Sequence, residues 1–132
     1  MQVSDLPSPD GAEAKECADL HGDLPKTIGD KLEKRTVEPS SPLLAAWGKP
    51  AVVLRCGVGT PASYRPGTDL TIVDNIGWYG DERPDDIVYT TITREPRVAL
   101  AIPRTHKSSF EILVDLAPSV SRHTTGPDLT AQ

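Results

Sequence analysis

Thirteen prolines are spread along the 132-residue chain, and together with ten glycines they limit what the chain can fold into. Proline ends helices and is excluded from central strands, so closely spaced prolines permit only short helices and strands. A chain of this length still buries about two-thirds of the surface that its unfolded form exposes. We therefore expect a single packed core built from short elements and many turns.

Two β-rich runs, IVYTTIT and RVALAI, flank the short loop REP and predict a β-hairpin. We expect Thr93 to pair with Arg97, because this register places nearly all the large aliphatic residues on one face of the hairpin. The other face then carries Tyr89, Thr91 and Thr93 opposite small residues and Arg97. That face is predicted to be small and polar.

The run AVVLRC, residues 51–56, predicts a buried strand. Side chains alternate along a strand, so Cys56 points into the core and Arg55 points to the opposite face. This separation argues against a reactive arginine–cysteine pair, because a catalytic cysteine needs its activating group beside it. A further strand is expected at 70–73, and residues 76–79 either continue it or form another short strand.

A first helix is expected directly after the start of the chain. Asp10 followed three residues later by Glu13 is typical of a helix start. The apolar spacing from Ala14 to Leu24 predicts that this helix ends at the following proline, with Cys17 facing the core.

A second helix is predicted from the capping box SSFE, which begins at Ser108, and it ends or kinks at Pro118. Its core-facing residues are expected to be Phe110, Leu113, Val114 and Ala117. The stretch from Phe110 to Leu116 also alternates as a strand would, and the helix is the favoured alternative. Residues 26–44 are predicted to form an irregular connection, with one helical turn around 42–47.

The order of helix, strands, hairpin and helix predicts an α+β fold. We expect an antiparallel sheet of about four to five strands with both helices packed on one face, which makes a two-layer sandwich. Residues 10–122 are assigned to this single domain, with 1–9 as a flexible lead-in and 123–132 as a flexible tail.

Charge and residue spacing exclude several classes of partner. A net charge of -5 without a basic stripe argues against nucleic-acid binding, because phosphate recognition needs clustered lysine and arginine. No apolar run is long enough to span a bilayer. The acidic loop 81–86 lacks the spacing of a calcium loop, and the histidines have no companions at ligand spacing. We predict no metal, no cofactor and no identifiable catalytic residue.

The two cysteines, Cys17 and Cys56, are both predicted to face the core from different elements. Three states fit this arrangement: independent buried thiols, half of a metal site, or a disulfide. A disulfide would close a loop of about 40 residues, which the chain-entropy model values at roughly 4 kcal/mol. The residues favour the disulfide, and free thiols remain the main alternative.

The candidate ligand-binding residues are Arg55, Trp78, Tyr79, Tyr89, Thr91 and Arg97. The two arginines with nearby hydroxyls would suit a carboxylate or phosphate, because a guanidinium presents paired donors to planar anions. The adjacent aromatics would anchor a protein or stack on a sugar. The alternatives are an ordinary solvated sheet face and a core position for one aromatic, since strand alternation buries only one of two neighbours.

The stretches CADLHGDLP, AAWGKPAVVLRCGV and TTITREPRVALAIP follow one another along the chain, with Trp78 between the second and the third. In these stretches the chain resembles the actinobacterial domain-of-unknown-function family 3515, and WGxPxxxLRCGV is the most specific part. Members of this family have no assigned activity. The resemblance implies a secreted or lipid-anchored protein of the cell envelope.

An extracytoplasmic location implies an oxidising compartment, which strengthens the expectation of a Cys17–Cys56 disulfide. The residues before Cys17 form neither a signal segment nor a lipidation motif, which departs from the family pattern. A sequence that begins after a removed signal segment would explain this departure. We expect a non-catalytic module, a monomer or weak dimer, that binds an envelope protein or a cell-wall component or serves as an accessory subunit without a ligand. The alternative is a small enzyme that acts on an anionic cell-wall precursor.

Overall fold

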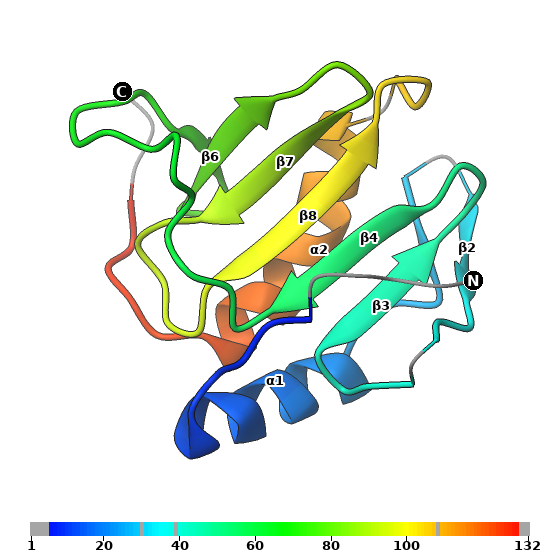
Figure 1. Cartoon of the computed structure of the whole chain (residues 1–132), viewed down its shortest axis with the longest axis horizontal. Coiled ribbons are helices and arrows are strands. Elements are labelled where there is room, and N and C mark those ends of the chain that lie inside the picture. Colours follow the sequence, from blue (N-terminus) through cyan, green and yellow to red (C-terminus); the bar gives the residue numbers. More distant parts are fainter. Residues whose placement is uncertain (1–5, 30, 39, 108, 130–132) are drawn as a thin grey trace.

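The computed structural model describes residues 6–29, 31–38, 40–107 and 109–129. These residues form one eight-stranded antiparallel sheet with two helices on one of its faces (Figure 1). In chain order the elements are α1 (Gly11–Gly22), β1 (Thr27–Ile28), β2 (Leu32–Arg35), β3 (Leu44–Trp47), β4 (Val52–Cys56), β5 (Thr71–Val73), β6 (Ile76–Glu82), β7 (Asp86–Thr91), β8 (Val98–Pro103) and α2 (Ser109–His123). The predicted α+β class with an antiparallel sheet is confirmed, whereas the predicted number of strands was too low.

The sheet consists of two four-stranded meanders that meet at its centre, in the spatial order β1-β2-β3-β4-β8-β7-β6-β5. Each meander runs from one edge of the sheet inward, so β4 and β8 become neighbours. In that central pair Leu54 lies opposite Leu100, and Arg55 lies opposite Ala99. The two halves therefore share one continuous sheet whose middle strands come from distant parts of the sequence.

The N-terminal meander contains the strands that the sequence did not predict. LAAW in β3 was expected to be a helical turn, but all four residues are buried, and the strand pairs with β2 and β4 on its two sides. β2 reads LEKR and is largely exposed, so it has no apolar alternation to reveal it. Pairing with neighbouring strands, a tertiary effect, overrides the local preference of these segments.

The strands expected at 70–73 and 76–79 are present as β5 and β6, and they pair as a hairpin that the sequence did not predict. Its two turn residues, Asp74 and Asn75, have φ angles of 54° and 66°. Positive φ at both positions is what a tight two-residue hairpin turn requires, and aspartate and asparagine tolerate it. β6 continues to Glu82, three residues past the predicted end at Tyr79.

The β7–β8 hairpin is present, but its register is shifted by one residue from the prediction. Thr90 pairs with Ala99 instead of Leu100. The hydroxyl of Thr91 accepts a hydrogen bond from the backbone N–H of Val98 at 2.9 Å. This bond ends the strand pairing before the predicted position, so the loop is longer than the predicted REP. Because strand side chains alternate, this shift turns every β7 side chain to the face opposite the one predicted.

Both helices pack over the same face of the sheet, and the main core lies between them and the strands. Its largest fully buried members include Trp47, Trp78, Leu100, Ile112 and Leu116. α1 begins as predicted, since the backbone N–H of Glu13 donates to Asp10 Oδ1 at 2.9 Å. No helix within the described ranges is both long enough and apolar enough to cross a bilayer.

The helix predicted near the C-terminus is confirmed as α2, but its buried face differs from the prediction. It buries Ile112, Leu113, Leu116, Ala117 and Val120. Phe110 and Val114, which were expected in the core, are 60% and 43% exposed. The helix passes through Pro118 to His123, and the predicted capping residue Ser108 lies outside the described residues.

Candidate functional site: a groove on the open face of the sheet

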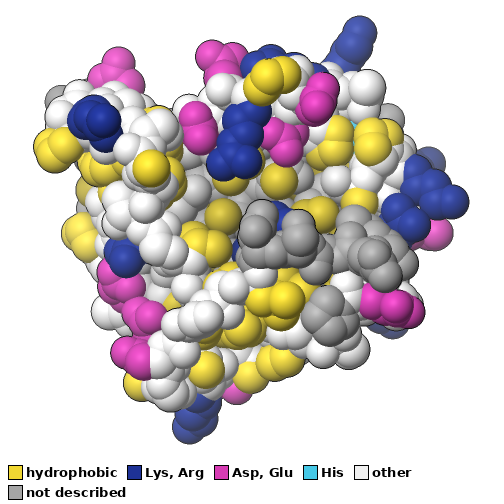
Figure 2. All heavy atoms as spheres, viewed as in Figure 1, with side chains coloured by type: hydrophobic (Ala, Val, Ile, Leu, Met, Phe, Trp, Pro, Cys, Tyr) yellow, Lys and Arg dark blue, Asp and Glu magenta, His cyan; other side chains and the backbone are white. Residues whose placement is uncertain are grey.

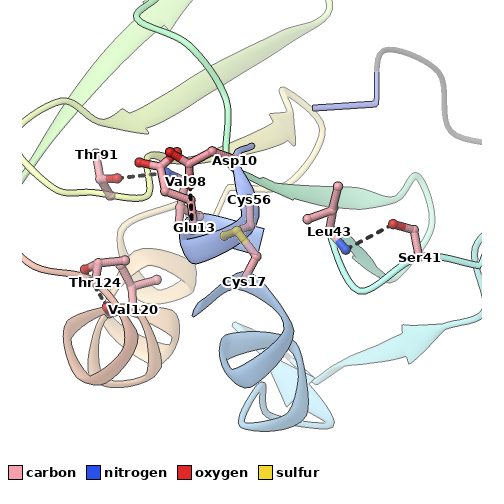
Figure 3. The surroundings of a disulfide bond; sticks show 10 residues. All are labelled: Asp10, Glu13, Cys17, Ser41, Leu43, Cys56, Thr91, Val98, Val120 and Thr124. Carbon is pink, nitrogen blue, oxygen red and sulfur yellow. Dashed lines mark hydrogen bonds between the residues drawn. A yellow bond between two sulfur atoms is a disulfide. The ribbon is translucent and has the colours of Figure 1, made fainter. Parts of the chain in front are cut away.

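Cys17 of α1 and Cys56 of β4 form the predicted disulfide (Figure 3). Their Cα atoms are 5.7 Å apart, and both residues are buried in the core. The bond joins the first helix to a central strand on the helix-covered face. With Cys56 held inward, its neighbour Arg55 is directed to the opposite, open face of the sheet.

The open face holds a groove of about 330 Å³ that crosses β4, β8, β7 and β6. Arg55 lines it from β4, Asp86 and Val88 from β7, and Asp81 from β6. Val58, Gly59 and Pro61 belong to the loop after β4 and line its side. A volume of this size falls at the lower end of the range for small-molecule sites.

β8 forms the floor of this groove because its side chains alternate between large and small. Val98, Leu100 and Ile102 are buried in the core, whereas Ala99 and Ala101 face the groove. Alanine side chains are short, so the open face of the sheet is lowest along β8. The composition VALAIP thus produces both a packed core and a hollow on the open face.

The loop after β4 also covers Tyr79. The tyrosine hydroxyl and the Ser63 hydroxyl are hydrogen-bonded at 2.8 Å, and the Tyr64 ring meets the Tyr79 ring edge-on at 5.3 Å between centroids. Tyr79 is consequently buried, as is its neighbour Trp78. The expectation that only one of these two aromatics is buried was wrong, because the loop forms a second layer over part of the open face.

Charged side chains gather at one end of this face, beside a stretch of hydrophobic side chains (Figure 2). Arg83 Nε donates to Asp81 Oδ2 at 3.4 Å. Arg104 Nε donates to the carbonyl of Arg83 at 2.8 Å, which positions the turn between β6 and β7. Because the predicted strand stopped at Tyr79, the sequence did not connect Asp81 and Arg83 with Arg55.

The structure places the six candidate ligand-binding residues in four different environments. Arg55 lines the groove; Trp78, Tyr89 and Thr91 face the helix-covered core; Tyr79 lies under the loop; and Arg97 lies in another hollow. The register shift explains the positions of Tyr89 and Thr91, since it exchanges the two faces of β7. Val88 and Thr90 occupy the groove in their place.

A family model for a protein of unknown function, DUF3515, matches residues 1–127. The chain belongs to this family. The match confirms the resemblance first suggested by the CADLHGDLP and WGKPAVVLRCGV stretches. No curated protein and no solved structure matches the chain. Because the family carries no assigned activity, the function of this DUF3515 protein has to be argued from its own geometry.

Arg97 of the DUF3515 chain lies in a hollow of about 520 Å³ between the segment before α1 and the start of β8. Its guanidinium donates to Glu95 Oε1 at 2.6 Å. A hydrogen bond to Glu95 raises the pKa of Glu13, and burial and repulsion by Glu95 add to that effect. The charge of Arg97 is therefore balanced by Glu95, which makes this hollow poorly suited to an anionic ligand.

A buried arginine in the β7–β8 loop was missed by the sequence reading. Arg94 is 4% exposed. Its guanidinium donates to Thr124 Oγ1 and to the carbonyls of Ser121, Thr124 and Gly126. These acceptors belong to the end of α2 and to the segment predicted as a flexible tail. Most of them are backbone carbonyls about 30 residues away, so no local sequence pattern marks the interaction.

Proposed function

We propose that this DUF3515 protein is an extracytoplasmic, non-catalytic module of the cell envelope, secreted or lipid-anchored, that binds a cell-wall component or an envelope protein. The groove on the open face is the observation that carries this proposal. It combines an aliphatic floor of Ala99 and Ala101 with charged side chains around its rim. Mostly apolar hollows with a few convergent polar groups are typical of ligand sites.

The disulfide supports the extracytoplasmic location. Disulfides persist in oxidising compartments and are rare where cellular thiols keep cysteines reduced. The Cys17–Cys56 bond is buried in the core, so the fold is built around the oxidised state. Thiol alkylation of the protein in intact cells tests this part: we expect modification only after denaturation with a reductant. Alkylation after denaturation without a reductant would contradict the proposed compartment.

Recognition fits the groove better than catalysis. Covalent catalysis needs a nucleophile within hydrogen-bond reach of a base. The described lining residues are arginine, aspartate, threonine, glycine, proline and aliphatic residues, and the threonine, Thr90, is 1% exposed. Paired charges around an apolar floor serve to orient a ligand. Measurable turnover of an anionic cell-wall precursor would contradict the non-catalytic role and favour the enzyme alternative.

Titration of the isotopically labelled protein with soluble peptidoglycan fragments tests the binding role. We expect the amide signals of Val88, Ala99 and Ala101 to shift, and Arg55→Ala to weaken binding about tenfold, as for a lost charge-assisted hydrogen bond. Arg122→Ala is the matched control, because this arginine bonds Asp23 at the helix side. Equal binding by both variants, or shifts confined to the helices, would contradict the assignment of the groove.

A further inference from the structure

A hollow of about 340 Å³, separate from the groove, lies beside the N-terminal meander. It opens where the pairing between β2 and β3 ends. Arg35, the last residue of β2, lies opposite Ala46, whereas β3 begins two residues earlier at Leu44. The first half of the outer edge of β3 is therefore not covered by β2. The polar residues that line the hollow are His21, Lys34, Arg35, Thr36, Ser40 and Ser41.

The positive charges beside this hollow are not balanced by carboxylates. Its described lining contains no aspartate and no glutamate, and within the described ranges neither Lys34 nor Arg35 forms an ion pair. Arg35 Nη1 donates to the carbonyl of Gly48 at 3.1 Å. That acceptor is neutral, so the guanidinium is held in place and keeps its charge. The hollow is thus locally positive, although the chain as a whole carries a net charge of -5.

Side chains from other segments converge on the same space. Ser41 Oγ accepts a hydrogen bond from the backbone N–H of Leu43 at 3.1 Å, so its own proton is available for a ligand. Burial and the positive charge of Lys34 lower the pKa of His21, and a hydrogen bond to the backbone of Leu44 opposes them. Lys34 on β2 therefore lies within electrostatic range of the last turn of α1.

We infer that this hollow binds the phosphate group of a phosphate monoester. Such a group is a tetrahedral dianion that accepts hydrogen bonds in several directions, and lysine, arginine and hydroxyl donors suit it. The hollow is larger than a phosphate group, so room remains for the organic part of the ester. A carboxylate has one charge and two oxygens and uses fewer of these donors. The inference goes beyond the proposed function and does not depend on the groove.

Titration of the isotopically labelled protein with glycerol phosphate and with acetate, at equal ionic strength, tests the inference. We expect glycerol phosphate to shift the amide signals of Lys34, Arg35 and Ser41 and to bind about tenfold more tightly than acetate. The signals of Ala99 and Ala101 in the groove should stay in place. Equal affinities for the two anions would overturn the inference, because a merely solvated basic edge attracts any anion weakly.

Two lysine variants separate a built site from general attraction of anions. Lys34→Gln should weaken glycerol phosphate binding about tenfold. Lys107→Gln is the matched control, because it removes the same charge from an exposed lysine that does not line the hollow. Equal affinities of the two variants would overturn the inference. If Lys34→Gln disturbs the amide spectrum, Ser40→Ala at an exposed position replaces it, with an expected loss of about threefold.

The ring-proton signal of His21 gives a readout that does not rely on affinity. A dianion in the hollow stabilises the imidazolium and should raise the pKa of His21, opposite to the effect of Lys34. Excess sulfate is the probe, because its double charge stays constant while histidine titrates. His106, which bonds the carbonyl of Pro50, is the internal control. An unchanged pKa of His21 would contradict binding in the hollow.

Vesicles distinguish the two sources of a phosphate monoester. Phosphatidylcholine vesicles that contain phosphatidic acid present the group on a lipid surface, whereas glycerol phosphate presents it in solution. Retention of the wild type but not of Lys34→Gln on these vesicles would assign the ligand to a lipid headgroup, and binding of glycerol phosphate alone would assign it to a soluble ester. If neither binds, the inference is overturned, and the peptidoglycan titration still tests the groove separately.

Discussion

The two meanders of the sheet are tied to their helices by different chemistry. In the N-terminal half, a covalent bond joins Cys17 of α1 to Cys56 of β4. In the C-terminal half, Arg94 in the β7–β8 loop holds the end of α2 and the segment after it through hydrogen bonds. A disulfide acts largely by restricting the unfolded chain, whereas a buried guanidinium acts only once the chain is folded. The stability of the N-terminal half therefore depends on the oxidation of its two cysteines. The stability of the C-terminal half depends on the hydrogen bonds that Arg94 makes in the folded protein.

The difference matters for the groove because the groove lies across the boundary between the halves. Arg55 comes from the N-terminal meander, and Asp81 and Asp86 come from the C-terminal one. Their relative positions depend on the β4–β8 pairing and on both attachments. A substitution that removes either attachment is therefore expected to weaken ligand binding even though it changes no residue of the groove.

Removing the disulfide is expected to have the largest effect. Cys17→Ala combined with Cys56→Ala opens a loop with a sequence separation of 39 residues. The chain-entropy model gives a loss of about 4 kcal/mol in the free energy of unfolding. Urea denaturation followed by circular dichroism measures it. The wild-type protein with and without reductant is the matched comparison, and an unchanged midpoint in the double variant would contradict the dominance of the covalent attachment.

Replacing Arg94 is expected to have the next largest effect. Arg94→Met keeps much of the side-chain volume but leaves several buried acceptors without a donor, at a cost of about 3 kcal/mol. Hydrogen exchange should show the loss of protection at the end of α2 first. Arg104→Met, at a half-exposed arginine, serves as the control and should change the stability by less than about 0.5 kcal/mol. Equal losses in both variants would contradict the role of Arg94.

The smallest effect concerns a contact that joins the two helices directly. Asp23, which caps α1, accepts hydrogen bonds from Arg122 Nε at 2.8 Å and from His123 Nε2 at 3.0 Å. These bonds lower the pKa of Asp23 in the folded protein below its ordinary value of 3.8. The unfolded chain therefore takes up the proton first, so this contribution is complete above the ordinary value and lost as pH falls through the folded pKa.

The stability difference between the wild type and Asp23→Asn is thus expected to be present near pH 6 and to shrink as the pH falls below about 4. Thermal denaturation over this pH range measures the difference. Asp69→Asn, in the exposed loop after β4, is the control and should show no such trend. A difference that stays constant down to pH 2 would contradict the coupling between α1 and α2.

The elements that the sequence predicted correctly are those with short-range causes. The Asp10 cap and the alternation in VVLRC each depend on neighbours within a few residues. The strands it missed, such as β2 with its polar LEKR, exist because another strand lies beside them. The same reason explains the incorrect register of the β7–β8 hairpin, which Thr91 decides by bonding Val98 across the pair.

For the candidate site, the sequence by itself determined that Cys56 and Arg55 lie on opposite faces of β4, because alternation is a property of the strand alone. It also identified the cysteine pair, since only two cysteines are present. Only the tertiary structure decided that Asp81 and Asp86 share a groove with Arg55, and that Arg94 holds the C-terminal segment. Those neighbours are set by the order in which the strands assemble, and no local pattern of residue types specifies that order.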